Sequence, residues 1–332
     1  MFSRRNFLKL AVLLLLPWRK LAAQAKPQRI FKLGFGSCAY QTDEQPIWDA
    51  IVKSKPDVFA LIGDNIYGDT EDMNEMAAKY QEMAKHPQFS NFRRHIPLIA
   101  TWDDHDFGAN DAGREYPKKA ESKGLMLQFF NEPKTSKRWS RDGVYTSYFF
   151  GEIQVILMDL RWFRSPLVAD QDGHYIPNPD PAAEMLGAQQ WAWLEQELRK
   201  PASFRILASS TQFVSPIHHW EKWANFPYEK ARMLKLIDDL KIKNLVIISG
   251  DMHYGELSME TTPAGLNLYD LTSSGLNFTE SADGILNPNR LALFEDCNFG
   301  LVTIDTELMQ ARLELRNVAG QTVTFRDVQF TS

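Results

Sequence analysis

The sequence lacks the features that mark several classes of protein. Its 332 residues include only two cysteines, which excludes a small scaffold held together by several disulfides. The net charge is −5 at pH 7, so no overall basic character attracts nucleic acid, and we predict no specific nucleic-acid partner. No internal repeat or long linker is visible. With 44% hydrophobic residues, the chain is long enough to bury one large core.

The N-terminus has the pattern of an export signal. Arg4 and Arg5 precede a short apolar run at 10–16, which is too short to span a bilayer comfortably. The paired arginines resemble a signal read by the twin-arginine translocase, and an ordinary secretory signal with two chance arginines is the alternative. We predict a signal peptide at 1–25 and a single domain at 26–332. The protein is then periplasmic or extracellular, or membrane-associated if the signal is retained.

Short apolar runs alternate with helical patterns along the chain. Strands are predicted at 31–36, 58–62, 98–102, 155–158, 206–209 and 245–249. Helices are predicted at 47–53, 73–85, 118–130, 188–198 and 229–240. After about residue 255 the pattern is mostly strand, at 267–271, 300–305, 312–316 and 322–328. This order predicts an α/β fold with two stacked mixed sheets flanked by helices. The stretch 170–181, rich in Asp and Pro, is interpreted as a surface loop bordering the functional cleft.

Four predicted strands end in side chains that bind metals. These ends are Ser37-Cys38, Gly63-Asp64-Asn65-Ile66-Tyr67, Asp103-Asp104-His105-Asp106 and Gly250-Asp251-Met252-His253. Because the carboxyl ends of strands form the ligand crevice of open α/β sheets, we expect these side chains to meet.

A bound metal explains why so many carboxylates gather there. Without cations, packed carboxylates repel one another and their pKa values rise. The glycine before Asp64 and the glycine before Asp251 let the backbone approach an ion closely. One aspartate shared by two ions holds a two-metal site, which clamps the attacking and leaving oxygens of an in-line displacement. The sequence therefore predicts a two-metal centre.

These motifs resemble those of the alkaline phosphatase D (PhoD-like) family, within the calcineurin-like metallophosphoesterase fold. The matching segments are Gly36–Cys38, Gly63–Tyr67, Trp102–Asp106 with Asn110, Asp159–Arg161 and Gly250–His253. They span residues 30 to 255, and the strand-rich tail fits the second sheet of that fold. The resemblance implies a four-layer sandwich and a metal-dependent phosphomonoesterase or phosphodiesterase.

The resemblance also implies a ligand set for each ion. Cys38, Asp64, Tyr67 and His253 would hold Fe³⁺. Asp64 would bridge to a second divalent cation, expected to be Ca²⁺ and held also by Asp251 and Asn110. Asp104 is the alternative to Asn110, because related phosphoesterases carry a metal-binding Asn at its place in the motif. Both assignments stay open.

Four side chains are implied in catalysis or substrate binding. His105 would approach the leaving group as an acid, and Arg161 would bind phosphoryl oxygens of the ester. Arg164 and His219 are further substrate-binding candidates. Three of them have a structural alternative: His105 as a cap beside an aspartate, Arg161 as a partner of Asp159, and His219 in a surface loop.

An alternative reading is a non-catalytic exported binding protein on the same fold, with a disulfide between Cys38 and Cys297. The loss of ligands such as Asp64 or His253 would mark such a protein, and no such loss is visible. The position of Cys38 at a strand end beside the other motifs favours a ligand role over the disulfide. The preference for monoesters or diesters stays open.

Overall fold

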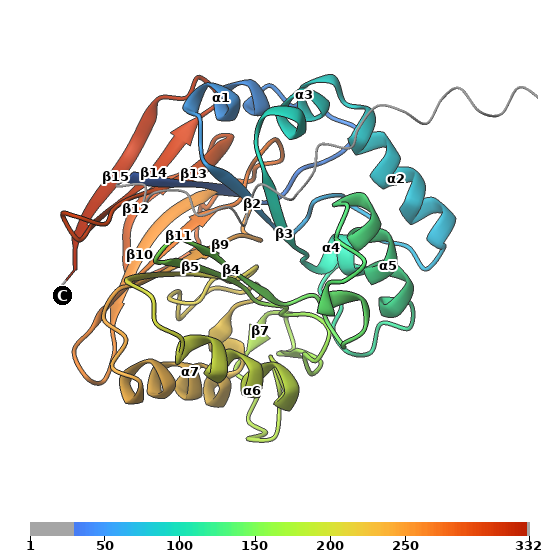
Figure 1. Cartoon of the computed structure of the whole chain (residues 1–332). Helices are drawn as coiled ribbons and strands as arrows, with labels where there is room; N and C mark the ends of the chain where they lie inside the picture. The colour runs from blue at the N-terminus through green and yellow to red at the C-terminus, as the bar shows by residue number, and fades with distance from the viewer. Residues whose placement is uncertain (1–29, 331–332) are drawn as a thin grey trace, which may run out of the picture.

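Two large sheets form the centre of the molecule, and helices cover the outer face of each (Figure 1). The computed structural model describes residues 30–330. Within them the layers follow one another as helices, six-stranded sheet, seven-stranded sheet and helices, beside a small two-stranded ribbon. The predicted α/β fold with two stacked mixed sheets is confirmed.

The six-stranded sheet has a parallel and an antiparallel part. Its order is β15-β14-β13-β1-β2-β3. The strands are β1 (Ile30–Gly36), β2 (Val58–Ile62), β3 (Leu98–Thr101), β13 (Asn298–Asp305), β14 (Gln310–Asn317) and β15 (Thr322–Gln329). The first three run parallel, and β13 pairs antiparallel with β1. All five residues of β2 are buried, which is typical of a parallel strand covered on both faces.

The seven-stranded sheet has the order β12-β10-β11-β9-β8-β5-β4. The strands are β4 (Thr146–Phe150), β5 (Ile153–Leu157), β8 (Phe204–Ala208), β9 (Leu245–Ser249), β10 (Gly255–Thr261), β11 (Asn267–Ser273) and β12 (Arg290–Phe294). Its four central strands, β11, β9, β8 and β5, are parallel, and the flanking pairs are antiparallel. The ribbon consists of β6 (Val168–Ala169) and β7 (Tyr175–Ile176).

The helices divide between the two outer layers. Those beside the six-stranded sheet are α1 (Ile47–Ser54), α2 (Met73–Lys85), α3 (Pro87–His95), α4 (Asp104–Phe107) and α5 (Lys119–Phe129). Those beside the seven-stranded sheet are α6 (Gly187–Leu198) and α7 (Pro227–Asp239). Two short 3₁₀ helices are η2 (Lys137–Trp139) and η3 (Trp223–Asn225). The side chain of Asp72 caps α2 by accepting from the amide of Asn74. Both α3 and α7 open with a proline, whose missing N–H is no loss in a first turn.

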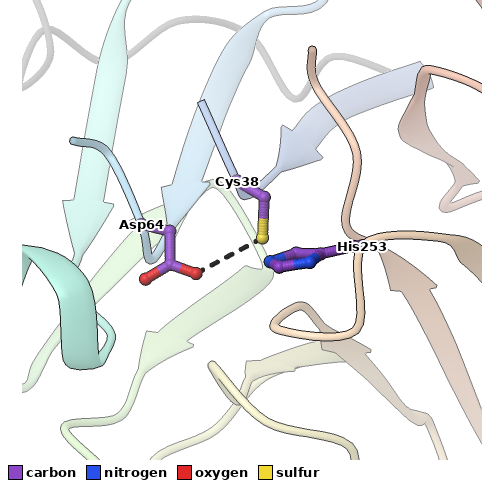
Figure 2. Close-up of side chains that lie close together, drawn as sticks. All are labelled: Cys38, Asp64 and His253. Atoms are coloured by element: carbon purple, nitrogen blue, oxygen red, sulfur yellow. Dashed lines mark hydrogen bonds between the residues drawn. The ribbon is translucent and has the colours of Figure 1, made fainter. Parts of the chain in front are cut away.

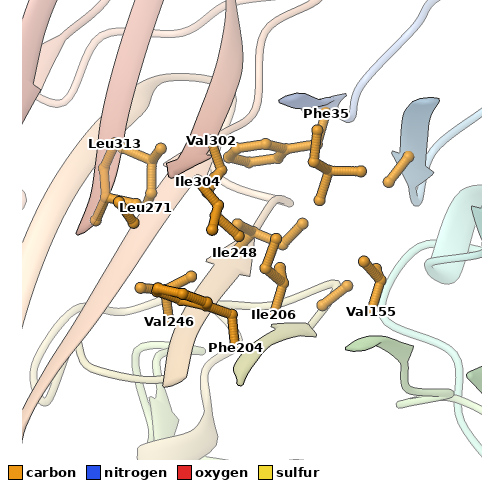
Figure 3. Close-up of a cluster of buried hydrophobic side chains, with 14 of the residues drawn as sticks. Phe35, Val155, Phe204, Ile206, Val246, Ile248, Leu271, Val302, Ile304 and Leu313 are labelled. Carbon is orange, nitrogen blue, oxygen red and sulfur yellow. The ribbon is translucent and has the colours of Figure 1, made fainter. Parts of the chain in front are cut away.

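The main core lies between the two sheets. Phe35 and Val302 from one sheet face Ile206 and Ile248 from the other (Figure 3). Two further apolar clusters fill the space between each sheet and its helices. Each sheet is therefore buried on both faces, which holds the strand ends in fixed positions.

The sequence patterns located most elements correctly. Every predicted helix and strand is present within a few residues of its expected bounds. The elements α3, α4, β4, β6, β10 and β12 were not predicted, and the expected loop 170–181 contains β7 of the ribbon. The predicted signal at 1–25 lies outside the described residues, so the division at residue 26 stays a prediction. No helix among residues 30–330 is long and apolar enough to cross a membrane.

The two sheets meet at the carboxyl ends of their parallel strands. Ser37, just after β1, forms a parallel bridge with Ser274, just after β11, and the Ser37 amide donates to the Ser273 carbonyl at 3.1 Å. This junction brings the ends of β1, β2 and β3 beside the end of β9.

Candidate metal centre

Cys38, Asp64 and His253 come together from three strand ends, as Figure 2 shows. The ligand atoms of these three side chains all lie within 4.8 Å of one another. The Cys38 thiol donates to Oδ2 of Asp64 at 3.3 Å, and its sulfur lies 3.1 Å from Oγ of Ser274. A thiolate, a carboxylate and an imidazole form a mixed ligand set suited to a transition metal.

Tyr67 joins this group. Its hydroxyl lies 3.2 Å from Nε2 of His253, and its ring packs against His105 with centroids 4.3 Å apart. The side chain is 6% exposed, so the phenol points into the protein beside the ligands. The four side chains expected for the first ion are therefore brought together.

A second group shares Asp64 with the first. Asp64, Asp103, Asp104 and Asp251 offer carboxylate oxygens within 4.8 Å of one another. Asp64 also groups with Asp104 and His105. Oxygen-only ligands are those that hard divalent cations prefer. Asp64 is thus positioned to contact two ions at once.

The backbone is held in an unusual conformation at these ligands. Cys38, Asp64, Asp251 and His253 all have positive φ, between 48° and 74°. Residues with a Cβ seldom adopt this region, and such positions cluster at functional sites. The strand ends turn sharply there, and the turn directs each side chain into the junction between the sheets.

Two glycines permit this close approach. A Cβ at Gly63 would lie 2.5 Å from Cβ of Asp103, and the backbone there has φ +129°. A Cβ at Gly250 would lie 2.4 Å from Oγ of Ser37. The Gly-Asp pairs of the sequence therefore have a steric reason as well as a conformational one.

Asp106 fastens two of the strand ends together. Its Oδ1 accepts from the amides of Asp103 and Asp64 at 2.8 and 3.2 Å. Its Oδ2 accepts from Nδ2 of Asn65 at 2.5 Å. Asp106 is fully buried and positions the ends of β2 and β3 relative to one another.

The crowded carboxylates need a cation. Burial raises the pKa of Asp64 well above its ordinary value, and the charges of Cys38 and the neighbouring aspartates raise it further. Burial and the charges of Asp103 and Asp104 likewise raise the pKa of Asp251. A bound cation removes this penalty by stabilising the ionised forms.

The residues present fit two metal ions. Oδ1 of Asp64 and Oδ2 of Asp103 are buried and accept no hydrogen bond from the described residues. Burial alone would raise the pKa of the Cys38 thiol. The charge of His253, with hydrogen bonds to His253, Ser274 and Ser37, lowers it instead to about 6. Orphaned carboxylate oxygens beside an acidic thiol are the donors that an ion would satisfy.

His105 lies at the edge of the centre, and Asp69 orients it. Nδ1 of His105 is 2.8 Å from Oδ1 of Asp69, which leaves the other ring nitrogen for the site. Burial lowers the pKa of His105, but the Asp69 hydrogen bond and the charges of Asp104 and Asp69 outweigh it and raise it to about 9.

Arg161 sits in a buried chain of charges. Its Nε donates to Oδ1 of Asp103 at 2.5 Å, and its Nη1 donates to Oε2 of Glu221 at 2.6 Å. Arg164 approaches the other oxygen of Glu221 at 3.0 Å. Both guanidinium groups are fully buried. In this structure Arg161 therefore contacts two carboxylates and adds positive charge behind Asp103.

Asn110 and His219 lie farther out. Asn110 is exposed, and its side chain donates to Oδ2 of Asp111 rather than grouping with the aspartates. The amide of Asp111 donates to Oδ2 of Asp104 at 2.6 Å. The residue that follows Asn110 therefore contacts the aspartate group directly. His219 is exposed and stacks on His174 with ring centroids 3.7 Å apart.

Comparison with known proteins gives the family of this chain. A model of the family described as PhoD-like phosphatase matches residues 33–282, which carry all the strand ends above. The chain belongs to the PhoD-like phosphatase family.

Individual relatives agree with this membership. Alkaline phosphatase D of Bacillus subtilis (strain 168) is 24% identical over 272 residues, covering 68% of this chain and 46% of the relative. The chain thus spans about half the length of that relative. A solved structure of PhoD superposes with a TM-score of 0.74 at 15% identity, covering 92% of this chain and 72% of that one. A dimetal phosphatase from Danio rerio gives 0.60 at 12% identity, covering 92% and 100%. These structures share the metallophosphoesterase fold.

The disulfide considered for this PhoD-like chain is not formed. Cys38 and Cys297 are both free thiols, Cys38 buried and Cys297 partly exposed. The sulfur of Cys38 is engaged by Asp64 and Ser274 instead. That part of the alternative reading is wrong, because the turn after β1 directs Cys38 into the ligand cluster.

Four residues of the PhoD-like site were not assigned a role from the sequence. Asp103 was visible in the acidic motif, and Glu221 lies in the segment next to His219. No sequence motif marks Asp69 or Ser274 as a site residue, because each contacts the site through a partner distant in sequence.

Proposed function

We propose that this chain hydrolyses phosphate esters at a two-metal centre, with water as the nucleophile. The observation that carries the proposal is the position of Asp64, which belongs to both the sulfur-containing and the all-carboxylate ligand group. A carboxylate shared in this way would hold two cations close together, and such a pair stabilises the attacking and leaving oxygens of an in-line displacement at phosphorus. The activity of the whole chain is part of the proposal, since the match covers 46% of the relative from Bacillus subtilis.

The ligand sets favour two different ions. Cys38, Asp64, Tyr67 and His253 would hold Fe³⁺, for which thiolate and phenolate are suitable anionic donors. Asp64, Asp104 and Asp251 would hold a hard divalent ion such as Ca²⁺, with Asn110 as a further candidate. When bound, the two ions supply an activated water and neutralise the charge that develops on the phosphoryl oxygens.

The protein side chains handle the proton and the geometry. His105, oriented by Asp69, donates a proton to the leaving oxygen of the ester. Arg161 supplies positive charge next to Asp103 and holds that carboxylate in place. Binding of phosphoryl oxygens by Arg161, Arg164 or His219 remains a proposal, and the burial of both arginines favours a positioning role for them.

The substrate is a monoester or diester of phosphoric acid. The acidic net charge of −5 disfavours polymeric nucleic acid, whose backbone needs a basic groove. Export through the twin-arginine translocase, to the periplasm or the outside of the cell, stays a proposal that rests on residues 1–25.

The test is direct hydrolysis. Protein loaded with iron and calcium is assayed against p-nitrophenyl phosphate and bis-p-nitrophenyl phosphate, with Asp251→Asn as a variant of one ligand. Release of nitrophenol that is lost in the variant supports the proposal. A fully metal-loaded protein that releases none from either ester contradicts it and favours the non-catalytic binding protein.

A further inference from the structure

A loop that the sequence patterns did not mark lies against the candidate metal ligands. It comprises residues 276–280, directly after the end of β11 and its bridge to β1. The amide of Leu276 donates to the Ser37 carbonyl at 3.1 Å, and the amide of Glu280 donates to the His253 carbonyl at 3.0 Å. The loop is therefore fastened at both ends to turns that carry ligands.

The middle of this loop is fastened to a third turn. Oδ1 of Asn277 accepts from the amide of Tyr40 at 2.7 Å, and its Nδ2 donates to the carbonyl of Tyr40 at 2.9 Å. One side chain thus satisfies both backbone groups of a residue two positions after Cys38. Such pairing holds the backbone of Tyr40 next to Asn277 and its neighbour Phe278 before any ligand binds.

Two partly exposed rings stand next to the ligand rings. Phe278 packs edge-on against His253 with centroids 4.6 Å apart, and against Tyr67 at 5.5 Å. Tyr40 lies 4.7 Å from Tyr67 and 5.7 Å from Phe278. Tyr67 is buried, whereas Tyr40 and Phe278 retain exposed surface. We call the pair Tyr40 and Phe278 the aromatic wall.

We propose that the aromatic wall binds an aromatic group carried by the alcohol part of the phosphate ester. The inference rests on the proposed function, because the phosphoryl group must sit on the metal centre for its substituent to reach the wall. Each ring of the wall packs directly against a candidate ligand, Tyr40 against Tyr67 and Phe278 against His253. A group attached to a phosphorus bound at the metal centre therefore lies beside the wall. Exposed aromatic rings stack favourably with flat rings, and burial of their surface adds to the gain.

The spacing of the rings selects a flat group over a cation. A quaternary ammonium ion needs open faces of several rings around it. Here the rings lie 4.7 to 5.7 Å apart and contact one another, so no space remains between them for a cation. Only the exposed outer surface of Tyr40 and Phe278 is available to a ligand, and a planar group covers such a surface best.

The test compares two phosphonates that differ in one ring. Calorimetry on the metal-loaded protein measures dissociation constants for benzylphosphonate and methylphosphonate, which share the group that binds the metals and are not hydrolysed. The wild type is expected to bind benzylphosphonate about tenfold more tightly. Because the ratio is taken within each protein, any change in phosphonate affinity common to both ligands cancels.

Two variants and a control locate the preference. Phe278→Leu and Tyr40→Leu remove one ring each and are expected to bring the ratio towards 1. Tyr40 packs against Tyr67 and Phe278 but not against His253, so Tyr40→Leu leaves the packing of His253 intact if Phe278→Leu disturbs that ligand. Phe325→Leu, at a ring 54% exposed on β15, should keep the wild-type ratio.

The outcomes separate this inference from the proposed function. A wild-type ratio near 1, or a high ratio that survives in both variants, overturns the aromatic wall even if the protein hydrolyses esters. A tenfold preference lost in the variants supports the wall, even if no ester is hydrolysed and the catalytic proposal has to be abandoned.

Discussion

Asp69 accepts a hydrogen bond from His105 across the edge of the candidate metal centre, with Oδ1 and Nδ1 2.8 Å apart. The same carboxylate also accepts from the amide of Asn110 at 3.0 Å. Asp69 therefore ties the imidazole to the loop that follows the acidic motif. Its charge keeps a proton on His105, whose pKa is raised to about 9 against the effect of burial.

Replacing Asp69 with asparagine should impair this proton donor. The Asp69→Asn variant retains the size of the side chain but loses the negative charge that orients and protonates His105. We expect kcat to fall roughly ten- to hundredfold. The alkaline limb of the pH profile should move to lower pH, because the proton is then lost more readily. Kinetics as a function of pH at verified metal content measure both effects.

The matched control is Asp43→Asn, at an exposed carboxylate that accepts a hydrogen bond from its neighbour Thr42. It should leave kcat and the alkaline limb unchanged. An Asp69→Asn variant with a wild-type pH profile would refute the role of this pair.

Glu221 should be a major contributor to stability. It is 1% exposed and pairs with the buried guanidinium groups of Arg161 and Arg164. Glu221→Gln removes the negative charge between the two buried guanidinium groups and leaves Asp103 as the carboxylate paired with Arg161. Breaking a buried charge pair in this way destabilises a protein by about 3–5 kcal/mol. Denaturant unfolding of the metal-free protein measures the free energy.

An exposed pair provides the comparison for Glu221. Glu195 near the end of α6 and Arg199, the residue after that helix, form an (i, i+4) pair with both side chains about half exposed. Glu195→Gln should change the free energy of unfolding by less than about 1 kcal/mol. Equal effects of the two variants would mean that the buried chain of charges contributes no more than a surface pair.

His218 should make the stability depend on pH below neutrality. Burial, together with the charges of Lys222, His219 and Arg290, lowers its pKa from 6.5 to about 3. As pH falls, the unfolded chain takes up a proton that the folded chain does not. The contribution of neutral His218 to the free energy of unfolding is therefore fully present above about pH 6.5 and is lost progressively towards pH 3.

The variant His218→Gln isolates this contribution. Between pH 7 and pH 5 the wild type should lose about 2 kcal/mol more of its free energy of unfolding than the variant loses. His95→Gln, at an exposed histidine, should behave like the wild type. Identical pH dependence in the wild type and in His218→Gln would show that His218 takes up its proton equally in both states.

The sequence predicted the parts of the site that lie at the ends of buried strands. Asp64 follows the fully buried β2, and Asp251 follows the fully buried β9, so the apolar pattern and the chemical motif coincide. The order of such strands was enough to predict the two stacked sheets. The edge strands β4 and β12 have no fully buried residue, are not followed by a ligand motif and were missed.

Side chains that act through tertiary partners were not predictable. The carboxylate of Asp69 belongs to the site because a loop places it 2.8 Å from His105, 36 residues away in sequence. Phe278 lies beside His253 because three separate turns fasten its loop. Arg161 was expected at phosphate, yet the fold surrounds it with Asp103 and Glu221, which lie 58 and 60 residues away. No spacing rule along the chain encodes such distances.

The central claim is that Asp64 holds two metal ions at once, and metal analysis of the purified protein tests it most directly. The wild type, prepared without chelator, should carry about one iron and one divalent ion per chain. Asp64→Asn should lose both together, whereas Asp43→Asn, at an exposed carboxylate outside the candidate metal groups, should lose neither. A wild type that binds no metal after refolding with iron and calcium, or an Asp64→Asn variant that retains both ions, would contradict the account.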